Sequence, residues 1–337
     1  MASAPALIAE DLVDSHGRAI SYLRISVTDR CDLRCRYCMA EDMTFLPRDQ
    51  MLSLDEVALI AERFIARGVR KIRLTGGEPL VRRDTIDLAR RLGRHVGSGL
   101  DELTLTTNGT HLDEHAEALF DAGIRRVNVS LDTRHPGLFR QITRHGEVTK
   151  VLGGIAAARA AGLAVKINMV ALKGLNEGEI ADMFAWVAME GMDLTLIETM
   201  PLGAIDEDRA DRFLPLGPIL GVLKAAFRLV PDLHSSGGPA RYWRLPGRST
   251  RLGLISPLTG NFCATCNRVR LSTDGKLHMC LGHEESVDLR EAIRSGGLVA
   301  VDSAITGALA EKPAAHDFRI ARGAAPAVSR HMSVTGG

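Results

Sequence analysis

Between about residues 20 and 200, short apolar runs rich in β-branched residues alternate with longer segments whose apolar residues recur every three or four positions. The short runs predict β-strands, and the longer segments predict amphipathic helices. Ser53 and Glu56 form a capping-box pattern at the start of the first helix candidate. The strand-like runs are YLRISVT, RKIRLTGGE, ELTLTTNG, RRVNVSLD, LAVKINMVAL and MDLTLIETM, and the helix candidates span 53–67, 82–94, 110–122, 148–161 and 178–189.

This alternation is typical of repeated βα units. Six parallel strands joined by right-handed crossovers predict an α/β fold, an incomplete (β/α)6 barrel with fewer than the eight strands of a closed one. In such barrels the reactive groups come from the C-terminal ends of the strands and the loops after them. The residues of this chain that fall there are Gly76, Gly77, Glu78, Thr106, Ser130 and Met200.

The alternation stops near residue 203. A helix candidate near 215–227 is followed by the stretch SSGGP and by short strand-like segments at 241–245, 252–256 and 268–272, while residues 296–337 are rich in Ala, Gly and Pro. We therefore expect two domains, a partial barrel over 1–200 and a smaller C-terminal region over 201–337.

The composition is that of an ordinary globular protein, with 45% apolar and 25% charged residues. The 42 Lys and Arg nearly balance the 41 Asp and Glu, so no overall field favours a nucleic acid. No apolar run has the length of a membrane span, and Glu10 and Asp11 interrupt the short apolar start. We expect a cytoplasmic protein that binds neither nucleic acid nor membrane, in a compartment where thiols stay reduced.

The six cysteines form two trios, of which the first is Cys31, Cys35 and Cys38. In a reducing compartment such clustering indicates metal binding before disulfides. Three thiolates can hold three irons of a cubane iron–sulfur cluster and leave the fourth iron for an external donor. A zinc site completed by a histidine is the alternative, although no histidine follows at the spacing of a zinc finger.

The segment CDLRCRYC, directly after a predicted strand, resembles the CxxxCxxC signature of the radical S-adenosylmethionine superfamily, and GGEP at 76–79 adds to the resemblance. The resemblance implies a [4Fe-4S] cluster that cleaves S-adenosylmethionine to a deoxyadenosyl radical. It also implies that the glycine segment receives the methionine amino group, although a tight βα turn would equally explain the two glycines. The cofactor-binding residues that it implies are Tyr37, Gly77, Ser130 and Met200.

The second trio is Cys263, Cys266 and Cys280, again without an obvious fourth ligand. We expect a second cluster whose open iron binds substrate. One shared six-thiolate site, or a structural zinc completed by a histidine, His278 or His283, are the alternatives.

Arginines accompany this second trio. Arg268 and Arg270 occupy alternate positions of a predicted strand and so face the same side. Two guanidinium groups on one face suit a phosphate ligand. Further candidates on other predicted strands are Arg24, Arg73 and Lys166.

The second trio with its NRVR segment resembles the GTP 3′,8-cyclase family, which acts first in molybdenum cofactor biosynthesis, and the match runs nearly end to end. The resemblance implies that the radical takes the ribose 3′ hydrogen of GTP and that C3′ then attacks guanine C8. The product is (8S)-3′,8-cyclo-7,8-dihydroguanosine 5′-triphosphate. The GTP site that the resemblance implies, with guanine against the open iron of the second [4Fe-4S] cluster, comprises Arg24, Arg73, Thr106, Lys166, Arg268, Val269 and Arg270.

Two details complete this expectation. Thr195 stands where the resemblance leads us to expect an arginine. Gly336 and Gly337 are expected to thread toward the active site, although terminal glycines commonly fray.

The resemblance also implies partners: a low-potential electron donor, a downstream cyclic pyranopterin monophosphate synthase and a second copy in a homodimer. The competing interpretations are a radical enzyme that acts on a peptide or another small molecule, and a noncatalytic module that holds zinc at both trios.

Overall fold

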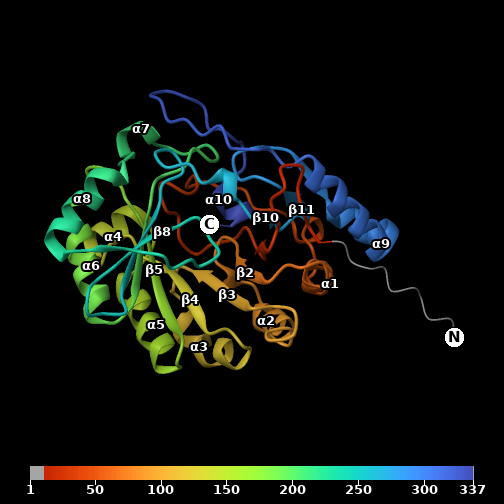
Figure 1. Ribbon diagram of the computed structural model, residues 1–337, viewed down its shortest axis with the longest axis horizontal. Coiled ribbons are helices and arrows are strands. Elements are labelled where there is room, and N and C mark those ends of the chain that lie inside the picture. Colours follow the sequence, from red (N-terminus) through yellow and green to blue (C-terminus); the bar gives the residue numbers. More distant parts are fainter. Residues whose placement is uncertain (1–10, 337) are drawn as a thin grey trace.

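The computed structural model describes residues 11–336, and its centre is a twelve-stranded sheet in the order β12-β11-β10-β1-β2-β3-β4-β5-β6-β9-β8-β7. Strands β1 to β6 pair in parallel in sequence order, each within an expected run. They curve around the middle of the molecule (Figure 1), which confirms the expected α/β partial barrel. Their bounds are β1 (Tyr22–Ser26), β2 (Lys71–Thr75), β3 (Glu102–Thr107), β4 (Arg126–Ser130), β5 (Ala164–Val170) and β6 (Asp193–Ile197).

Each strand presents two different faces because successive side chains point to opposite sides of a sheet. In β2, Ile72 and Leu74 belong to the core, whereas Lys71 and Arg73 line interior cavities. The same alternation places Asn128 of β4 and Lys166 of β5 inside the barrel. The apolar core therefore lies between sheet and helices, and the barrel interior is polar.

Helices cover the outside of the barrel strands (Figure 1). Ser53 accepts a hydrogen bond from the backbone of Glu56, whose carboxylate accepts one from the backbone of Ser53, which confirms the capping box. The sequence did not predict α4, whose N-cap His135 precedes Pro136 at the first helical position. The helices of this part are α1 (Leu54–Ala66), α2 (Thr85–Gly93), α3 (Leu112–Asp121), α4 (Pro136–Thr143), α5 (Val148–Ala160) and α6 (Ile180–Met189).

Two strands from beyond residue 200 continue the parallel sheet. β9 (Arg251–Ile255) pairs in parallel with β6, and β10 (Arg268–Leu271) pairs in parallel with β1. Antiparallel strands extend both edges: β7 (Val230–Asp232), β8 (Arg241–Arg244), β11 (Lys276–His278) and β12 (Ser286–Asp288). The later part of the chain thus covers both edges of the barrel strands, which would otherwise expose unpaired backbone groups.

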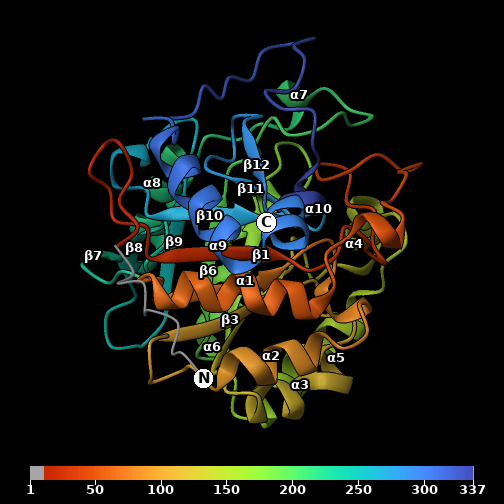
Figure 2. The ribbon, with the colours of Figure 1, turned by 90° about the vertical axis from the view of Figure 1, so that its right-hand side faces the viewer.

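The later helices are α7 (Arg209–Arg212), α8 (Leu216–Phe227), α9 (Leu289–Ala310) and α10 (Met332–Thr335). The expected helix at 215–227 is confirmed, but α9 was missed. It contains the glycine pair Gly296 and Gly297, and Gly297 interrupts the helix at φ 63°. Helix α9 lies beside α1 (Figure 2), where Arg63 and Asp302 form an ion pair. Tertiary packing therefore overrides a poor local helix propensity.

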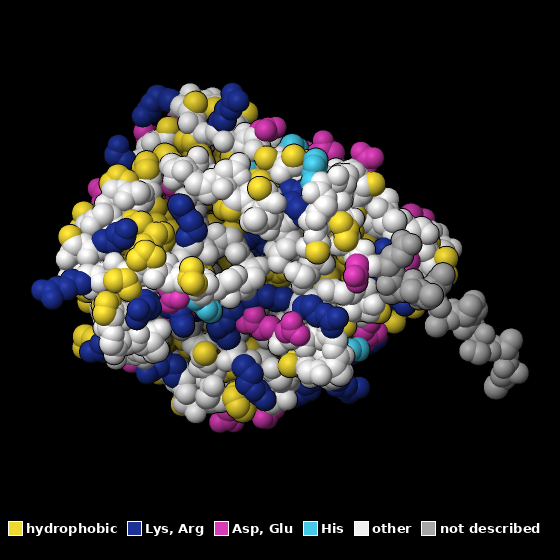
Figure 3. Space-filling view, in the orientation of Figure 1, with side chains coloured by type: hydrophobic (Ala, Val, Ile, Leu, Met, Phe, Trp, Pro, Cys, Tyr) yellow, Lys and Arg dark blue, Asp and Glu magenta, His cyan; other side chains and the backbone are white. Residues whose placement is uncertain are grey.

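The surface bears on the expected balance of charge, and the helices bear on the expected lack of a membrane span. Lys and Arg side chains are spread over the visible face, with Asp and Glu among them (Figure 3). Over residues 11–336, no helix has both the length and the apolar character needed to cross a bilayer.

Candidate active site

The first cysteine trio lies in the loop that follows β1. Cys31, Cys35 and Cys38 line one cavity, here called the Cys31–Cys38 cavity. Burial raises the pKa of the Cys38 thiol to about 12, and the carboxylate of Asp132 adds to the effect. Such thiols need a bound metal to become thiolates, and coordination supplies that stabilisation.

The expected cofactor residues come together here. The lining of the Cys31–Cys38 cavity includes Tyr37, Gly77, Ser130 and Met200. The Tyr37 hydroxyl donates to Asp132 at 2.8 Å, and Asp132 also accepts the backbone N–H of Val170 at 2.8 Å. Tyr37 therefore ties the cysteine loop to the ends of β4 and β5.

The two glycines pack against the cysteine loop. A Cβ on Gly76 would lie 2.3 Å from the Thr28 carbonyl oxygen, and one on Gly77 would lie 2.3 Å from that of Arg30. The Gly77 N–H donates to the Thr28 carbonyl at 2.7 Å. Close approach of two backbone segments thus requires glycine at both positions.

Glu78 anchors the same loop to the neighbouring strand. Its buried carboxylate accepts from the Thr107 hydroxyl at 2.9 Å and from the Asn108 N–H at 2.6 Å. Burial raises the pKa of Glu78 to about 7, although these hydrogen bonds oppose the rise. The amide of Asn108 in turn lies 3.7 Å from the Cys31 sulfur, so Glu78 helps to place a neighbour of the first trio.

Thr106 was expected in the GTP site, but it lines the Cys31–Cys38 cavity. Its buried hydroxyl has no hydrogen-bond partner among the described residues. The polar atom is thus available to a ligand in this cavity.

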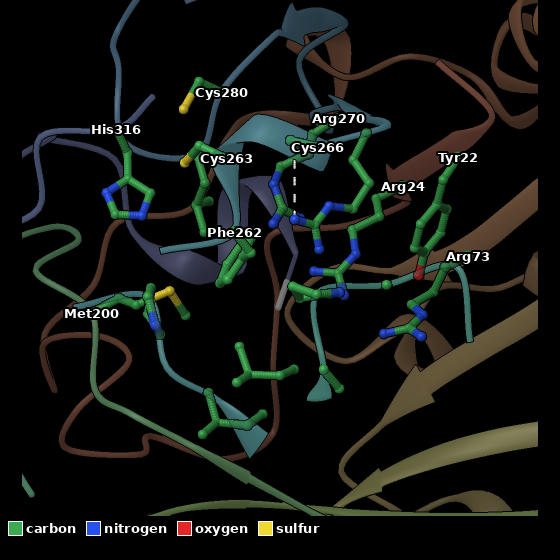
Figure 4. Close-up of a pocket in the computed structure, with 18 of the residues that line it drawn as sticks. Tyr22, Arg24, Arg73, Met200, Phe262, Cys263, Cys266, Arg270, Cys280 and His316 are labelled. Atoms are coloured by element: carbon green, nitrogen blue, oxygen red, sulfur yellow. Dashed lines mark hydrogen bonds between the residues drawn. The ribbon is translucent and has the colours of Figure 1, made fainter. Parts of the chain in front are cut away.

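The second trio lines a different cavity, here called the Cys263–Cys280 cavity. Cys263 and Cys266 flank a short 3-10 turn before β10, and Cys280 follows β11. Figure 4 shows the sulfur atoms of Cys263 and Cys280 on the same side of this cavity. Because the trios line separate cavities, the structure argues against one shared six-thiolate site.

The two cavities adjoin. Both are lined by Asn168 of β5, Ile197 of β6, Met200 and Met332. The two cysteine trios therefore line neighbouring cavities that share these four residues.

The zinc alternative needs His278 or His283 beside the second trio, but neither is among the residues that line its cavity. His278 is buried on β11, and the His283 ring lies 2.9 Å from the Ala315 carbonyl. A histidine that the sequence did not suggest, His316, does line the cavity and stacks on Phe318. In the described part of the chain, no three His, Cys, Asp or Glu side chains are close enough to hold a single metal ion.

Five buried cations line the Cys263–Cys280 cavity, and no carboxylate is among its described lining residues. All five were expected, and each is at most 8% exposed. Four strands carry them: the neighbouring strands β10, β1 and β2, and the more distant strand β5. The residues are Arg24 of β1, Arg73 of β2, Lys166 of β5 and both Arg268 and Arg270 of β10.

These cations are poorly compensated. The Nε atoms of Arg24 and Arg73 have no hydrogen-bond partner among the described residues. Burial lowers the pKa of Arg73 to about 10, and burial together with Arg126 and Arg73 lowers that of Lys166 to about 7. Uncompensated buried charge is costly, so the arrangement indicates an anionic ligand.

Tyr22, which the sequence did not suggest, lies among the same cations. Its hydroxyl is buried without a hydrogen-bond partner and points toward Arg73 (Figure 4). Burial favours the neutral phenol, but Arg73, Arg24 and Lys71 outweigh burial and lower its pKa to about 7. Tyr22 stands two residues before Arg24, so extending the period-2 pattern would have found it.

Val269 was expected in the GTP site, and Thr195 stands where an arginine was expected; neither residue lines the Cys263–Cys280 cavity. Val269 is fully buried in the apolar core, since it alternates with Arg268 and Arg270, and its side chain is absent from the cavity lining. Thr195 is also fully buried, and its hydroxyl has no described partner.

The second trio differs electrostatically from the first. Burial acts to raise the pKa of Cys266, but Arg268 and Lys312 outweigh it and lower the pKa to about 7. The Lys312 ammonium lies 3.8 Å from the Cys266 sulfur and donates to the Arg268 carbonyl at 3.0 Å. Lys312 lies far from the trio in the sequence, which is why the motif did not reveal it.

The end of the chain reaches this region. Helix α10 packs against β1 and lies near the centre of the view, among the strands (Figure 1). Gly336 is in the left-handed region at φ 74°, and a Cβ there would lie 2.0 Å from the Thr75 side chain. Gly337 lies outside the described residues.

Comparisons with known proteins bear on the fold and the family of the chain. A family model described as the radical SAM superfamily matches residues 25–187, and one described as Molybdenum Cofactor Synthesis C matches residues 192–318. Streptococcus suis SuiB bound to S-adenosylmethionine is a structural neighbour with a TM-score of 0.62 and 14% identity, covering 88% of this chain and 69% of SuiB. That likeness shows the fold.

Full-length relatives are far more similar. GTP 3′,8-cyclase of Erythrobacter litoralis is 56% identical over 98% of this chain and 100% of its own length. The enzymes of that name from Rhizobium etli and Caulobacter vibrioides are each 55% identical over 100% of this chain and 97% of their own length. With both trios and both family models in place, the chain belongs to the GTP 3′,8-cyclase family of the radical S-adenosylmethionine superfamily.

Proposed function

We propose that this chain catalyses the cyclisation of GTP to (8S)-3′,8-cyclo-7,8-dihydroguanosine 5′-triphosphate, the first step of molybdenum cofactor biosynthesis. GTP binds in the Cys263–Cys280 cavity, and S-adenosylmethionine binds in the adjoining Cys31–Cys38 cavity. The observation that carries the proposal is the group of five buried cations, with no carboxylate among the described lining residues, beside one cysteine trio in a cavity that shares lining residues with the cavity of the other trio. The relatives of the same name support it.

The cations account for the triphosphate. Guanidinium and ammonium groups form charge-assisted hydrogen bonds with phosphate oxygens, and burial strengthens them. Arg24 and Arg73 each keep an unpartnered Nε for this purpose. The negative charge of the triphosphate would neutralise these cations, whose burial destabilises the free protein.

The Cys31–Cys38 cavity suits the cofactor pair. Cys31, Cys35 and Cys38 would hold a [4Fe-4S] cluster, which would supply the electron for the reductive cleavage of S-adenosylmethionine. The unpartnered hydroxyl of Thr106 and the hydroxyl of Ser130 offer polar contacts to that cofactor. Met200 and Ile197 line both cavities, so apolar side chains lie between the two proposed ligands.

We also propose a second [4Fe-4S] cluster on Cys263, Cys266 and Cys280, with guanine at its open iron. Arg268 and Lys312 support it because they stabilise the Cys266 thiolate. Cys280→Ala should lower the iron content of the anaerobically reconstituted protein from about eight to about four per chain. The variant should still cleave S-adenosylmethionine but make no cyclised nucleotide, and normal product formation would contradict the role of this cluster.

The activity itself is tested by incubating the reconstituted protein anaerobically with S-adenosylmethionine, dithionite and GTP. We expect deoxyadenosine, methionine and a nucleotide with the mass of GTP but a new retention time and a changed guanine spectrum. Recovery of unchanged GTP beside full deoxyadenosine formation would refute the assignment of substrate.

The remaining expectations belong to the same proposal. The enzyme would work as a cytoplasmic homodimer, receive electrons from a low-potential donor and pass its product to a cyclic pyranopterin monophosphate synthase. Sedimentation of the reconstituted protein tests the homodimer.

A further inference from the structure

Three neighbouring strands shape one part of the barrel interior. Thr195 of β6 pairs with Gly253 of β9, and Gly253 pairs with Tyr242 of β8. A Cβ on Gly253 would lie 2.9 Å from both the Thr195 hydroxyl and the Tyr242 ring. The ring of Tyr242 therefore extends over Gly253 toward Thr195. This packing is possible because Thr195 is small and Gly253 has no side chain, which leaves room for the large ring of Tyr242.

The ring ends on a lysine of the anion site. The Tyr242 side chain is buried, and its hydroxyl accepts a hydrogen bond from the Lys166 ammonium at 2.6 Å. The hydroxyl also lies 2.9 Å from that of Ser236, and both Lys166 and Ser236 line the Cys263–Cys280 cavity. Burial raises the pKa of Tyr242, so its hydroxyl stays protonated and can donate a hydrogen bond in turn.

Lys166 needs such a partner because its surroundings are mainly positive. Arg73 and Lys71 face it from β2 and Arg126 faces it from β4, whereas Asp193 of β6 faces it with a carboxylate. Glu102 of β3 lines a second cavity with Lys166, but its carboxylate is ion-paired with Lys71 and Arg126. His234, in the segment before β8, also faces it. An oxygen acceptor favours the charged form of the lysine and fixes its direction.

Ser236, the other hydrogen-bond partner of the Tyr242 hydroxyl, is also fixed in place. The Lys71 ammonium donates to the Ser236 carbonyl at 2.6 Å and forms an ion pair with Glu102. The segment that carries Ser236 is thus held by one interior strand directly and by another through Tyr242. Small shifts of the Tyr242 hydroxyl are resisted from both sides.

We propose that Tyr242 is a positioning residue for the substrate: its hydroxyl holds the Lys166 ammonium toward the triphosphate, and its ring occupies the interior space that Thr195 and Gly253 leave open. Position 195, where an arginine was expected, therefore contributes no cation. On this side of the cavity Lys166, held by Tyr242, supplies the positive charge for the triphosphate. The inference rests on the proposed binding of GTP.

The test is a kinetic comparison of Tyr242→Phe, which removes only the hydroxyl, with Trp243→Phe on the same strand. The neighbouring Trp243 alternates with Tyr242 on β8, so it faces the other side of the sheet, where it packs against the apolar core. Tyr242→Phe should raise the KM for GTP about tenfold, as expected for a hydrogen bond to a charged group, while kcat at saturating GTP changes less than about twofold. Trp243→Phe should leave both constants unchanged.

A double-mutant cycle separates positioning from general loosening of the fold. If Tyr242 acts through the lysine, adding Tyr242→Phe to Lys166→Ala should weaken GTP binding no further. Equal losses in the presence and absence of Lys166 would overturn the proposal, as would an unchanged KM in Tyr242→Phe. Wild-type protein that leaves GTP unconverted would instead overturn the proposed function.

The packing is tested independently. Thr195→Arg should lower the melting temperature because the arginine meets the Tyr242 ring, and adding Tyr242→Ala should recover much of the loss. If the arginine is as well tolerated with the ring as without it, the ring does not occupy that space.

Discussion

The Nη1 atom of Arg270 lies 3.4 Å from the carbonyl oxygen of Gly336, so the last described residue of the chain touches β10, the strand beside β1. The contact joins β10 to the C-terminal tail at the cavity that holds the five cations. The tail therefore contacts an arginine of the proposed GTP site, and Met332 of α10 lines the same cavity.

Substituting Gly336 tests this contact. In Gly336→Ala the new Cβ would lie 2.0 Å from the Thr75 side chain, so the tail must leave its place. We expect GTP cyclisation to fall at least about tenfold while cleavage of S-adenosylmethionine continues, as for the loss of a contact worth about 1.4 kcal/mol. Gly323→Ala is the matched control, because Gly323 also has a positive φ, of 68°, but nothing within 4 Å of its Cβ position. Equal activity of the two variants would separate the tail from the reaction.

Arg73 should favour substrate binding at the expense of stability. Burial disfavours its charge, and its Nε has no hydrogen-bond partner among the described residues. Arg73→Met should therefore raise the melting temperature of the ligand-free protein while weakening GTP binding by about 1.5–3 kcal/mol. Differential scanning calorimetry and equilibrium binding measure the two effects. Arg70→Met, at an exposed residue just before β2, should change neither, and a destabilised Arg73→Met would contradict the prediction.

GTP binding should weaken as pH rises through neutrality. In the free protein the pKa of Lys166 is lowered to about 7, so above pH 7 the neutral lysine must take up a proton to bind the triphosphate. Tyr22, with a pKa also lowered to about 7, becomes negative over the same range and repels the phosphates. Both the loss of the Lys166 charge and the ionisation of Tyr22 therefore weaken GTP binding as pH rises. Titration calorimetry between pH 7 and 9 in buffers of different ionisation heat should show proton uptake on binding.

Two variants divide this pH dependence. Lys166→Arg keeps its charge and Tyr22→Phe cannot ionise, so each should flatten the profile in part and the double variant should flatten it further. A wild-type affinity that does not change from pH 7 to 9 would show that neither group titrates in that range.

Gly77 should be required for the first cluster. A Cβ at this position would lie 2.3 Å from the Arg30 carbonyl oxygen, so Gly77→Ala must displace the loop that begins with Cys31. We expect about four irons fewer per chain after anaerobic reconstitution and loss of S-adenosylmethionine cleavage. Gly178→Ala, with nothing within 4 Å of its Cβ position, should keep the full iron content. A fully loaded Gly77→Ala would mean that the loop tolerates the shift.

The sequence predicted the features that local periodicity encodes. Six barrel strands and their inward-facing cations follow from the period-2 pattern, which is why Arg24, Arg73 and Lys166 were found together with Arg268 and Arg270. The cavity that Thr106 lines was not predictable, because it depends on the stagger between strands. Tyr242 was missed because it reaches the interior across Gly253 only after β8 and β9 have paired with β6. Lys312 is brought to Cys266 by contacts between distant parts of the chain.

The pairing of β1 with β10 also determines how the protein can be made. Arg24 meets its partner Arg270 only after about 250 further residues have left the ribosome, so one edge of the nascent barrel stays open for most of translation. β1 and β10 can therefore pair only after five of the six cysteines, those that precede Arg268, have been synthesised.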